Sequence, residues 1–544
     1  MLIDFAVGNY LSFRDEVSFS LLAARSVKEH AGEDSPEDDN TIPLPGGKDR
    51  LLKCAAVYGA NGSGKSNLLK CLAHMRQAVL TSSADDTVMA RLSENHYRFS
   101  AESETKPSWV ELTFFVEETT YRYGFEFLKG TVTQEWLFKK PAESRRESYC
   151  FKRIGKTVEV NAAKWPEARG VAKKMRSDAL FLSTCAQFDV REALMLKGWF
   201  RKSLLVLTDH EKTALQHTVE VFEHDAELKA TILDFIRLID LGIRNIEIQK
   251  TPLPTGDETV AQLKRLLSAA GFPVPSGILN RVEIFAEHDV YADGKKQGTL
   301  RMPFEAESEG TQQVFALAGL WFGALRSGAT LLVDEFGASL HTKLAVELVK
   351  LFLQPCNVMA QLVVATHDTH LLRKDLLRRD QIWFTEKALY GASDLYSLVE
   401  YRINQSTAVR NDASFGKDYL AGKYGAIPYF RNVAQFIKDF TFMTSDSRFK
   451  KRNRSERLEN VRSERATAVP EEPKLVFNFK DFDASQSVSQ SFEARQKAEA
   501  IAEKQVAVYG AFPAGSDFRP PKHIAPDVQW AVIKSVKGLK GRKA

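Results

Sequence analysis

Apolar residues over the first 430 positions follow two periods, which predict alternating strands and helices. Ile3, Phe5 and Val7 alternate with other residues, and Leu11 and Phe13 continue the pattern, which predicts a strand that turns into a second strand. The apolar run 51–58 predicts a buried strand, and apolar residues at helical spacing from 67 to 75 predict a helix. A strand, a glycine-rich loop and a helix therefore follow one another here.

The middle of the chain changes from strand-like to helix-like patterns. Alternating runs at 110–116 and 121–128, separated by polar residues, predict a hairpin, and the run 149–160 extends its sheet. From about residue 168 to 272 the spacing is mostly helical, and the clearest amphipathic segment spans 214–240. We therefore expect a helical insert in this part of the chain.

Strands and helices alternate again after the insert. Asp293-Gly294 lies between the alternating runs 284–291 and 299–304, which predicts a second hairpin. A helix, a strand, a helix and a strand then follow at 311–325, Thr330–Val333, Thr342–Leu353 and 361–366. This alternation predicts an α/β fold. After about residue 431 the chain becomes basic and polar, and we expect only partial order there.

Composition excludes several classes of protein. The 544 residues are 44 % hydrophobic and 27 % charged, which is typical of globular proteins. No window approaches the roughly 18 apolar residues of a membrane span, and the first 13 residues are too polar for a signal peptide, so we expect a cytoplasmic protein. The five cysteines are scattered and never spaced C-x-x-C, so we expect reduced core thiols.

Residues 59–66 fit the pattern G-x-x-x-x-G-K-[ST], directly after a predicted strand and before a predicted helix. Backbone N–H groups of such a loop face phosphate oxygens, and the helix N-terminus adds partial positive charge. Lys65 would bridge the β- and γ-phosphates of ATP, and Ser66 would offer its hydroxyl to Mg²⁺. The candidate ATP contacts are Gly59, Asn61, Gly62, Ser63, Gly64, Lys65, Ser66 and Asn67.

Two acidic residues, Asp334 and Glu335, follow the apolar run Thr330–Val333. They would lie at the carboxyl end of a strand, where parallel sheets bind ligands. Asp334 would hold Mg²⁺ through water, and Glu335 would orient or deprotonate an attacking water. Such runs are common by themselves, and the pairing with the phosphate-binding loop makes this one informative.

His367 follows another apolar strand and is placed to contact a γ-phosphate. His341 and His370 lie near it in sequence, so a zinc site is the alternative. No cysteine or third clustered ligand supports that alternative.

With Ser308-Glu309-Gly310-Thr311-Gln312, these motifs resemble the ATP-binding-cassette (ABC) class of P-loop ATPases, which includes SMC proteins. The signature of that class is normally L-S-G-G-Q, and this chain keeps Ser308 and Gly310 but departs from it at Glu309 and Thr311. This form resembles the AAA-type, ABC-like ATPases of bacterial phage defence. Shorter motifs in family order extend the resemblance, at 9–13, 334–336, 339–341, 366–368, 379–384 and 424–428.

The resemblance implies an ABC-type ATPase head with a mixed sheet, flanking helices and an antiparallel β lobe. The N-terminal lobe would span 1–166, a helical insert 167–280, the C-terminal lobe 281–430 and a basic extension 431–544. It also implies a head-to-tail homodimer with ATP between Lys65 of one subunit and Ser308 and Gly310 of the other. Lys65, Glu335 and His367 would be catalytic, and Ser66 and Asp334 would hold Mg²⁺. We cannot assign the glutamine of the Q-loop that usually senses Mg²⁺ in this class.

The sequence shows no nuclease motif of its own. A Toprim nuclease needs a glutamate followed by D-x-D, whereas Glu386 is followed only by Asp394, and Asp481-Phe482-Asp483 lies in the polar tail. The resemblance therefore implies a regulatory ATPase with a separate effector, of which an HNH nuclease, as in retron and Septu systems, is favoured. A reverse transcriptase with its nucleic acid would be a further partner, and a defence ATPase with another effector remains an alternative.

The formal charge of +5 is unevenly distributed. Residues 448–465 and 534–544 each carry a net charge of +5, so the rest of the chain is mildly acidic. These stretches would contact phosphates of DNA or RNA, and a solvated charge run is the alternative. The candidate contacts are Lys450, Lys451, Arg452, Arg454, Lys540, Arg542 and Lys543.

The alternative function is an SMC-like ATPase of DNA repair or chromosome maintenance that clamps DNA. Long antiparallel heptads that end in a hinge or zinc hook would favour it, and the residues between Ser66 and Ser308 show neither. A transporter nucleotide-binding subunit and a non-hydrolysing nucleotide-gated scaffold are further alternatives.

Overall fold

The computed structural model describes residues 1–25, 27, 40–208, 212–239, 242–252, 280–388, 390–403, 407–409 and 413–428. The chain divides into two units, Met1–Phe430 and Arg431–Ala544, and all described residues belong to the first. Among the described residues, no helix has the length and apolar character that a membrane span requires. The basic stretches at 448–465 and 534–544 and the Asp481-Phe482-Asp483 segment lie outside the described residues.

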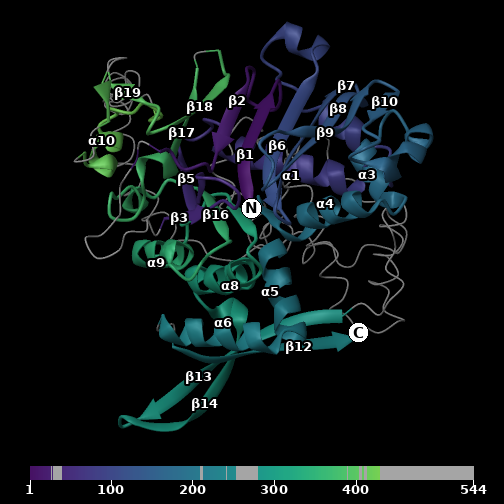
Figure 1. Cartoon of the computed structure of the whole chain (residues 1–544). Helices are drawn as coiled ribbons and strands as arrows, with labels where there is room; N and C mark the ends of the chain where they lie inside the picture. Colours follow the sequence, from purple (N-terminus) through teal and green to yellow (C-terminus); the bar gives the residue numbers. More distant parts are fainter. Residues whose placement is uncertain are drawn as a thin grey trace, which may run out of the picture. The chain divides into compact units, whose positions relative to one another are not determined.

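A six-stranded sheet forms the centre of the first unit (Figure 1). Its order is β11-β15-β16-β5-β17-β18, in which the first five strands are parallel and β18 is antiparallel to β17. The bounds are β5 Cys54–Tyr58, β11 Leu204–Leu207, β15 Thr330–Val333, β16 Gln361–Ala365, β17 Ile382–Lys387 and β18 Ser393–Ser397. This sheet, with helices between its strands, confirms the predicted α/β fold.

The strands β5, β11, β15 and β16 are mostly apolar because helices cover both faces of this part of the sheet. Ala55 and Val57 of β5 pack in one core cluster with Leu68 of α1 (Lys65–Thr81). Cys54 and Ala56 pack in another, with α8 (Glu309–Ser327) and α9 (Thr342–Leu353). Every side chain of β5 is therefore buried.

An antiparallel sheet lies beside the central one, with the order β10-β9-β8-β7-β6-β1-β2. The predicted hairpin is confirmed, because Glu117 and Glu118 form its two-residue turn with φ of 46° and 57°. The bounds are β1 Leu2–Gly8, β2 Val17–Ser20, β6 Ser108–Val116, β7 Thr119–Leu128, β8 Thr131–Pro141, β9 Ser148–Ile154 and β10 Thr157–Val160.

The expectation of a second strand at Leu11 and Phe13 is wrong. Asn9 and Leu11 have φ of 49° and 51°, and Tyr10 and Phe13 exchange backbone hydrogen bonds of 2.9 Å, which closes a tight turn. The strand that follows β1 begins only at Val17.

Within its described residues, the segment expected to be helical contains four α-helices and also two strands. The helices are α3 Phe181–Gln187, α4 Arg191–Lys202, α5 Lys212–His224 and α6 Ala226–Leu238, with the short 3-10 helices η2 Pro166–Gly170 and η3 Ala172–Lys174 before them. The amphipathic segment forms two helices, because the Asp225 side chain accepts the N–H of Leu228 and starts α6. β11 belongs to the central sheet and β12 (Ile243–Pro252) to a third sheet, which corrects the helical expectation.

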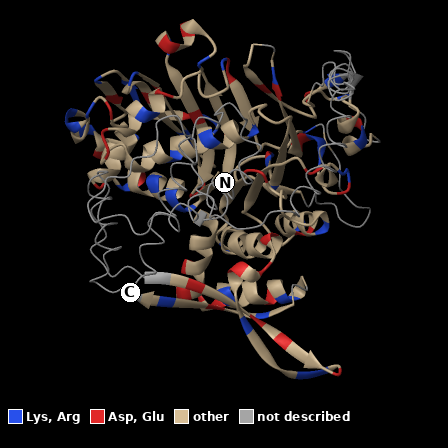
Figure 2. Ribbon diagram, turned by 180° about the vertical axis from the view of Figure 1, so that it is seen from behind, with Lys and Arg blue, Asp and Glu red and all other residues tan. Residues whose placement is uncertain are grey.

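The third sheet comprises β12, β13 (Asn280–Ala292) and β14 (Lys295–Pro303), and Figure 1 shows β13 and β14 extending away from α6. Asp293 and Gly294 form the predicted hairpin turn with φ of 51° and 72°. Acidic and basic side chains are interspersed along the sheet (Figure 2), and Lys296 and Arg301 pair with Asp289 and Glu247.

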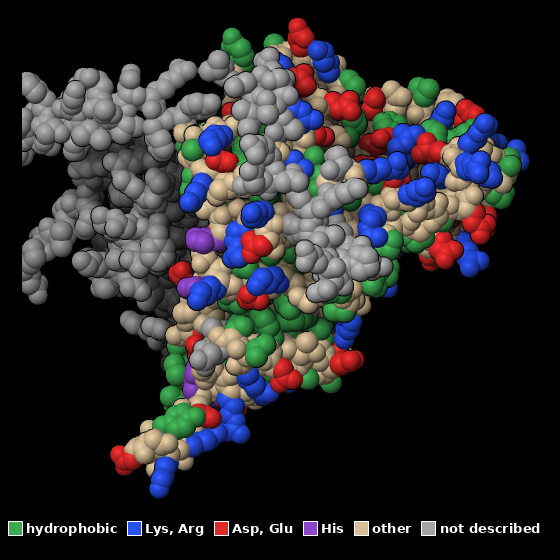
Figure 3. Space-filling view, turned by 60° about the vertical axis from the view of Figure 1, so that its left-hand side comes forward, with side chains coloured by type: hydrophobic (Ala, Val, Ile, Leu, Met, Phe, Trp, Pro, Cys, Tyr) green, Lys and Arg blue, Asp and Glu red, His purple; other side chains and the backbone are tan. Residues whose placement is uncertain are grey.

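The remaining elements are short. They are β3 Thr41–Pro43, β4 Arg50–Leu52, α2 Val88–Ser93, η1 Ala101–Thr105, η4 Phe304–Ala306, η5 Thr369–Leu371, η6 Arg379–Gln381, β19 Arg402–Ile403, β20 Thr407–Ala408 and α10 Phe415–Leu420. All five cysteines are free; four are buried and Cys356 is exposed, so Cys356 is not the core thiol that the sequence suggested. On the face shown in Figure 3, acidic, basic and apolar side chains are mixed over the described surface.

A buried ion pair joins the antiparallel sheet to α3. Arg153 Nη1 lies 3.3 Å from Glu135 Oε2, and both side chains are 0 % exposed. Glu135 also accepts the backbone N–H groups of Phe181 and Leu182 at 2.6 and 3.0 Å, and burial raises its pKa.

We predict that Glu135→Ala lowers the free energy of unfolding by about 3–5 kcal/mol, because Arg153 then stays buried without its counter-ion. Urea unfolding followed by circular dichroism measures the change. Glu102→Ala is the control, since Glu102 pairs with Lys106 on the surface and should cost less than about 1 kcal/mol. Equal losses in the two variants would contradict the prediction.

Candidate functional site

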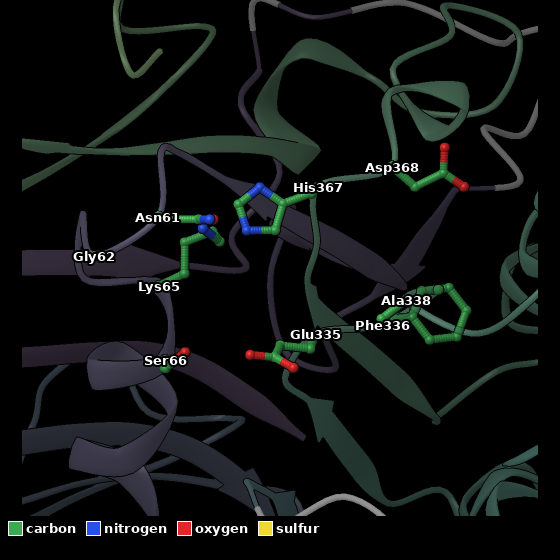
Figure 4. Close-up of a pocket in the computed structure, with 10 residues that line it drawn as sticks. Asn61, Gly62, Lys65, Ser66, Glu335, Phe336, Ala338, His367 and Asp368 are labelled. Carbon is green, nitrogen blue, oxygen red and sulfur yellow. The ribbon is translucent and has the colours of Figure 1, made fainter. Parts of the chain in front are cut away.

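A cavity of about 510 Å³ lies at the carboxyl ends of the parallel strands (Figure 4). The register of these strands pairs Val333 with Val364 and Ala365 with Val57, so the loops that follow β15, β16 and β5 meet at one edge. Ligands bind at this edge of open α/β sheets. The lining residues are Asn61, Gly62, Lys65, Ser66, Glu335, Phe336, Gly337, Ala338, His367 and Asp368.

The loop 59–64 presents a free helix N-terminus to this cavity. Gly64 is the residue before α1, has φ of 123°, and provides no side-chain cap for the helix. The first N–H groups of a helix have no partner within it, and no acidic residue lies in the first turn of α1. These amides and the helix dipole form a site for an anion.

Lys65 is held inside the loop. Its side chain is 7 % exposed, and Nζ donates to the carbonyl oxygens of Gly59 at 2.8 Å and Ala60 at 3.2 Å. Burial lowers the pKa of Lys65 to about 8, against the opposing charges of Asp334 and Glu335. The ammonium group is therefore close to its titration range near neutral pH.

Asp334 and Glu335 differ in exposure and backbone conformation. Asp334 is 4 % exposed, and its Oδ1 accepts the N–H of Glu335 at 3.0 Å. Glu335 has φ of 47°, a left-handed conformation that costs energy for glutamate and is often found at functional sites. Figure 4 shows its carboxylate directed toward Ser66, so a water in the cavity would lie within its reach.

The residues fit Mg²⁺. The Ser66 hydroxyl and the Asp334 and Glu335 carboxylates are oxygen ligands, and Mg²⁺ takes one or two protein oxygens together with water and phosphate. Asp334 does not line the cavity directly, which suits contact through water.

His367 lies beside Asn61 and Lys65 in Figure 4. Burial and then the charge of Lys65 lower its pKa, while Glu335 and Asp334 oppose that shift. This shift favours the neutral imidazole, which can donate one hydrogen bond to a phosphate oxygen.

The zinc alternative gains no support. His341 caps α9 by accepting the N–H of Lys343 at 3.2 Å, and His370 pairs with Asp368 at 2.8 Å. Over the described ranges, no group of three or more His, Cys, Asp or Glu side chains could hold a metal ion by itself.

The expected signature residues lie elsewhere in the same chain. Ser308 is exposed and starts α8, and its Oγ accepts the N–H of Thr311 at 3.2 Å. Neither Ser308 nor Gly310 lines the cavity. Glu309, the departure from the usual signature, is an exposed acid in the first turn of α8. A contact of Ser308 and Gly310 with ATP thus stays a prediction that a second subunit must satisfy.

Four other expected contacts do not line this cavity. Gly59, Ser63, Gly64 and Asn67 do not line it, although Gly59 and Ser63 line a neighbouring cavity of about 710 Å³. That second cavity shares Asn61 and His367 with the first and is completed by Ala60, Thr385, Glu386, Lys387, Tyr419, Ala426, Ile427 and Pro428.

The sequence analysis did not predict that Thr385 and Tyr419 line the second cavity. The motifs at 379–384 and 424–428, which lie near them in sequence, were the available signal, and the sequence analysis gave these motifs no role.

A family model described as "AAA domain, putative AbiEii toxin, Type IV TA system" matches residues 54–373. Among curated proteins, none matches the chain.

Several solved structures are similar at low identity. An SMC head bound to the C-terminal winged-helix domain of ScpA has 14 % identity, a TM-score of 0.34 and coverage of 73 % of this chain and 97 % of its own. The SMC head domain from Thermotoga maritima has 13 % identity and a TM-score of 0.32, and the match covers 73 % of this chain and 98 % of its own. The Pyrococcus furiosus Smc head with an extended coiled coil, bound to the C-terminal domain of ScpA, has 14 % identity and a TM-score of 0.31. The match covers 73 % of this chain and 96 % of its own.

We predict that ATP binding takes up a proton at about pH 9 and almost none through Lys65 at about pH 7. The pKa of Lys65 is about 8 in the free protein, and bound phosphates would raise it by favouring the charged form. Affinity should accordingly fall as the pH rises above about 8. Titration calorimetry in buffers of different ionisation enthalpy measures the uptake.

Lys65→Arg is the matched control, because arginine stays charged throughout this range. Uptake that is absent from the wild type at about pH 9, or that persists in Lys65→Arg, would contradict the assignment to Lys65.

Proposed function

We propose a function from one premise: the chain belongs to the AAA-domain family of the AbiEii type, whose model matches more than half of its residues. The chain is an ATP-hydrolysing switch of bacterial antiviral defence. It dimerises through its nucleotide and holds or releases a separate effector. The observation that carries the ATPase part is the convergence of Lys65, Ser66, Glu335 and His367 on one cavity.

Hydrolysis would rest on positioning and charge rather than on covalent chemistry. The amides of the loop 59–64 and Lys65 hold the phosphates. Glu335 takes a proton from, or orients, the attacking water, and His367 contacts the γ-phosphate. Ser66 and Asp334 would hold Mg²⁺, which would supply positive charge against the charge that develops on the phosphates.

The position of Ser308 supports the proposed dimer. Its hydroxyl and the N-terminus of α8 form an exposed polar surface that does not face its own phosphate-binding loop. A head-to-tail second copy would bring Ser308 and Gly310 to the open side of the cavity and complete the site. This arrangement makes ATP part of the interface.

The defence role is supported by the family description, which names a toxin of a type IV toxin–antitoxin system. Within that role, we favour a retron or Septu system, with an HNH nuclease as effector and a reverse transcriptase with its nucleic acid as a further partner. The basic residues 450–454 and 540–543 would contact the nucleic acid.

We predict that Glu335→Gln lowers ATP turnover about 10²-fold or more, because the carboxylate that acts on water is lost, while ATP binding is kept. With ATP, the variant should accumulate as a dimer, which light scattering after size-exclusion chromatography detects. Adding Lys65→Ala should abolish ATP binding and the dimer.

Glu347→Gln is the matched control, since Glu347 is an exposed carboxylate of α9 that pairs with Lys350. Its turnover should equal that of the wild type. Normal turnover in Glu335→Gln would remove Glu335 from this role, and a monomer in the presence of ATP would contradict the dimer.

We predict that alanine at Lys450, Lys451, Arg452 and Arg454 weakens binding to a duplex DNA or RNA probe, most strongly at low salt, and leaves ATP turnover unchanged. Each lost phosphate contact should reduce the slope of log affinity against log salt by about 0.7–0.9. Fluorescence anisotropy over a salt series measures the slope, and an unchanged slope would defeat the nucleic-acid contact.

A further inference from the structure

Two hydroxyl groups of the β17–β18 hairpin form hydrogen bonds with the phosphate-binding loop. Thr385 Oγ1 lies 2.6 Å from Ser63 Oγ and 3.3 Å from the carbonyl oxygen of Tyr58. The Ser393 hydroxyl donates to the carbonyl oxygen of Ser63 at 2.5 Å. We call Thr385 and Ser393 the hydroxyl clasp.

The clasp is buried. Thr385 is 0 %, Ser63 2 % and Ser393 5 % exposed, although Ser63 and Thr385 also line the second cavity. Loss of either hydroxyl would leave a buried polar atom without a partner. The backbone N–H of Ser393 also donates to the carbonyl oxygen of Ser12 at 2.7 Å, which fixes the start of β18.

The bond from Ser393 sets the direction of one loop amide. In a planar trans peptide, the C=O and the N–H point to opposite sides. Because the Ser63 carbonyl is turned out toward Ser393, the N–H of Gly64 must point the other way, into the curl of the loop. Amides in that direction are the groups that hold phosphate oxygens.

The bond from Thr385 turns the Ser63 side chain away from the nucleotide cavity, which Ser63 does not line. The space around the loop is full as well. A Cβ on Gly64 would lie 2.5 Å from Ser393 Oγ and 3.1 Å from Ser12 Oγ. A side chain at position 64 would therefore clash with the hairpin.

Tyr419 of α10 adds a third contact from the same C-terminal segment. Its ring centroid lies 5.8 Å from that of Tyr58, the residue just before the loop, and its phenol O–H donates to the carbonyl oxygen of Ala426 at 3.2 Å. Thr385, Ser393 and Tyr419 all lie beyond residue 373, where the family match ends.

We propose that the hydroxyl clasp positions the loop amides for the phosphates of ATP, so that residues outside the matched family domain set the affinity for nucleotide. This inference rests on the proposed function. Thr385 and Ser393 are positioning residues, because neither lines the nucleotide cavity. A loop without the clasp would sample orientations in which the Gly64 N–H faces away from the phosphate.

The test compares Thr385→Val and Ser393→Ala with the wild type in calorimetric binding of Mg-ATP and in steady-state turnover. Removing one buried hydrogen bond should raise the Kd and KM for ATP about tenfold. The kcat at saturating ATP should change less than about threefold, since Glu335 and His367 are untouched. Thr385→Ser, which keeps the hydroxyl, should restore affinity.

Ser397→Ala is the matched control. Ser397 lies on β18, as Ser393 does, and is 2 % exposed. Its Oγ has no hydrogen-bond partner in the described structure. It should bind ATP like the wild type. Wild-type affinity in both Thr385→Val and Ser393→Ala, or an equal loss in Ser397→Ala, would overturn the clasp.

Hydrogen exchange without nucleotide separates this inference from the proposed function. The clasp predicts faster exchange in peptides covering residues 58–66 of Thr385→Val and Ser393→Ala, with unchanged exchange in Ser397→Ala. Unchanged exchange in the clasp variants would overturn the clasp even if ATP binds. A wild type that binds no ATP would contradict the proposed function, whatever the exchange shows.

Discussion

The parallel register of β5, β16 and β15 is the constraint on which the site depends. It brings Gly59, Glu335 and His367 to one edge of the sheet although they come from three distant parts of the sequence. The register is fixed because alternate side chains of each strand enter different core clusters. A slip by one residue would exchange the two faces and bury the wrong set against α1.

Electrostatics explain why backbone amides matter so much here. Lys65 is the one cation among the cavity-lining residues described, whereas Glu335 and Asp368 are acidic. Asp334, which does not line the cavity, adds a third negative charge close to Lys65. Burial also lowers the pKa of Lys65 to about 8, so this charge is lost as the pH rises above that value. Side-chain charge alone would therefore repel a triphosphate, and the oriented amides of the loop, the dipole of α1 and a bound divalent cation must supply the attraction.

Much of the fold was predictable from local sequence, and the failures have physical causes. β5, the loop and α1 follow from a buried run, three glycines and a helical repeat, and the hairpin at Asp293-Gly294 follows from its turn residues. β11 was missed because Leu204–Leu207 is only four apolar residues long and fits either period. Leu11 and Phe13 kept the alternation of β1, but the left-handed conformations at Asn9 and Leu11 close a turn there.

The same limit applies to the site. Lys65, Ser66, Glu335 and His367 were predictable because each follows an apolar strand, and the sheet brings strand ends together. Thr385 and Ser393 hold the loop through hydroxyl groups that any strand can carry, so only the tertiary pairing of β17 with β5 reveals them. The two kinds of residue depend on each other: the glycines give the loop the freedom to curve around a phosphate, and the same freedom leaves its amides without a fixed direction. In the proposed clasp, the buried hydroxyl groups of Thr385 on β17 and Ser393 on β18 supply that direction. Because they lie outside the glycine-rich motif, the residues of the motif do not reveal them.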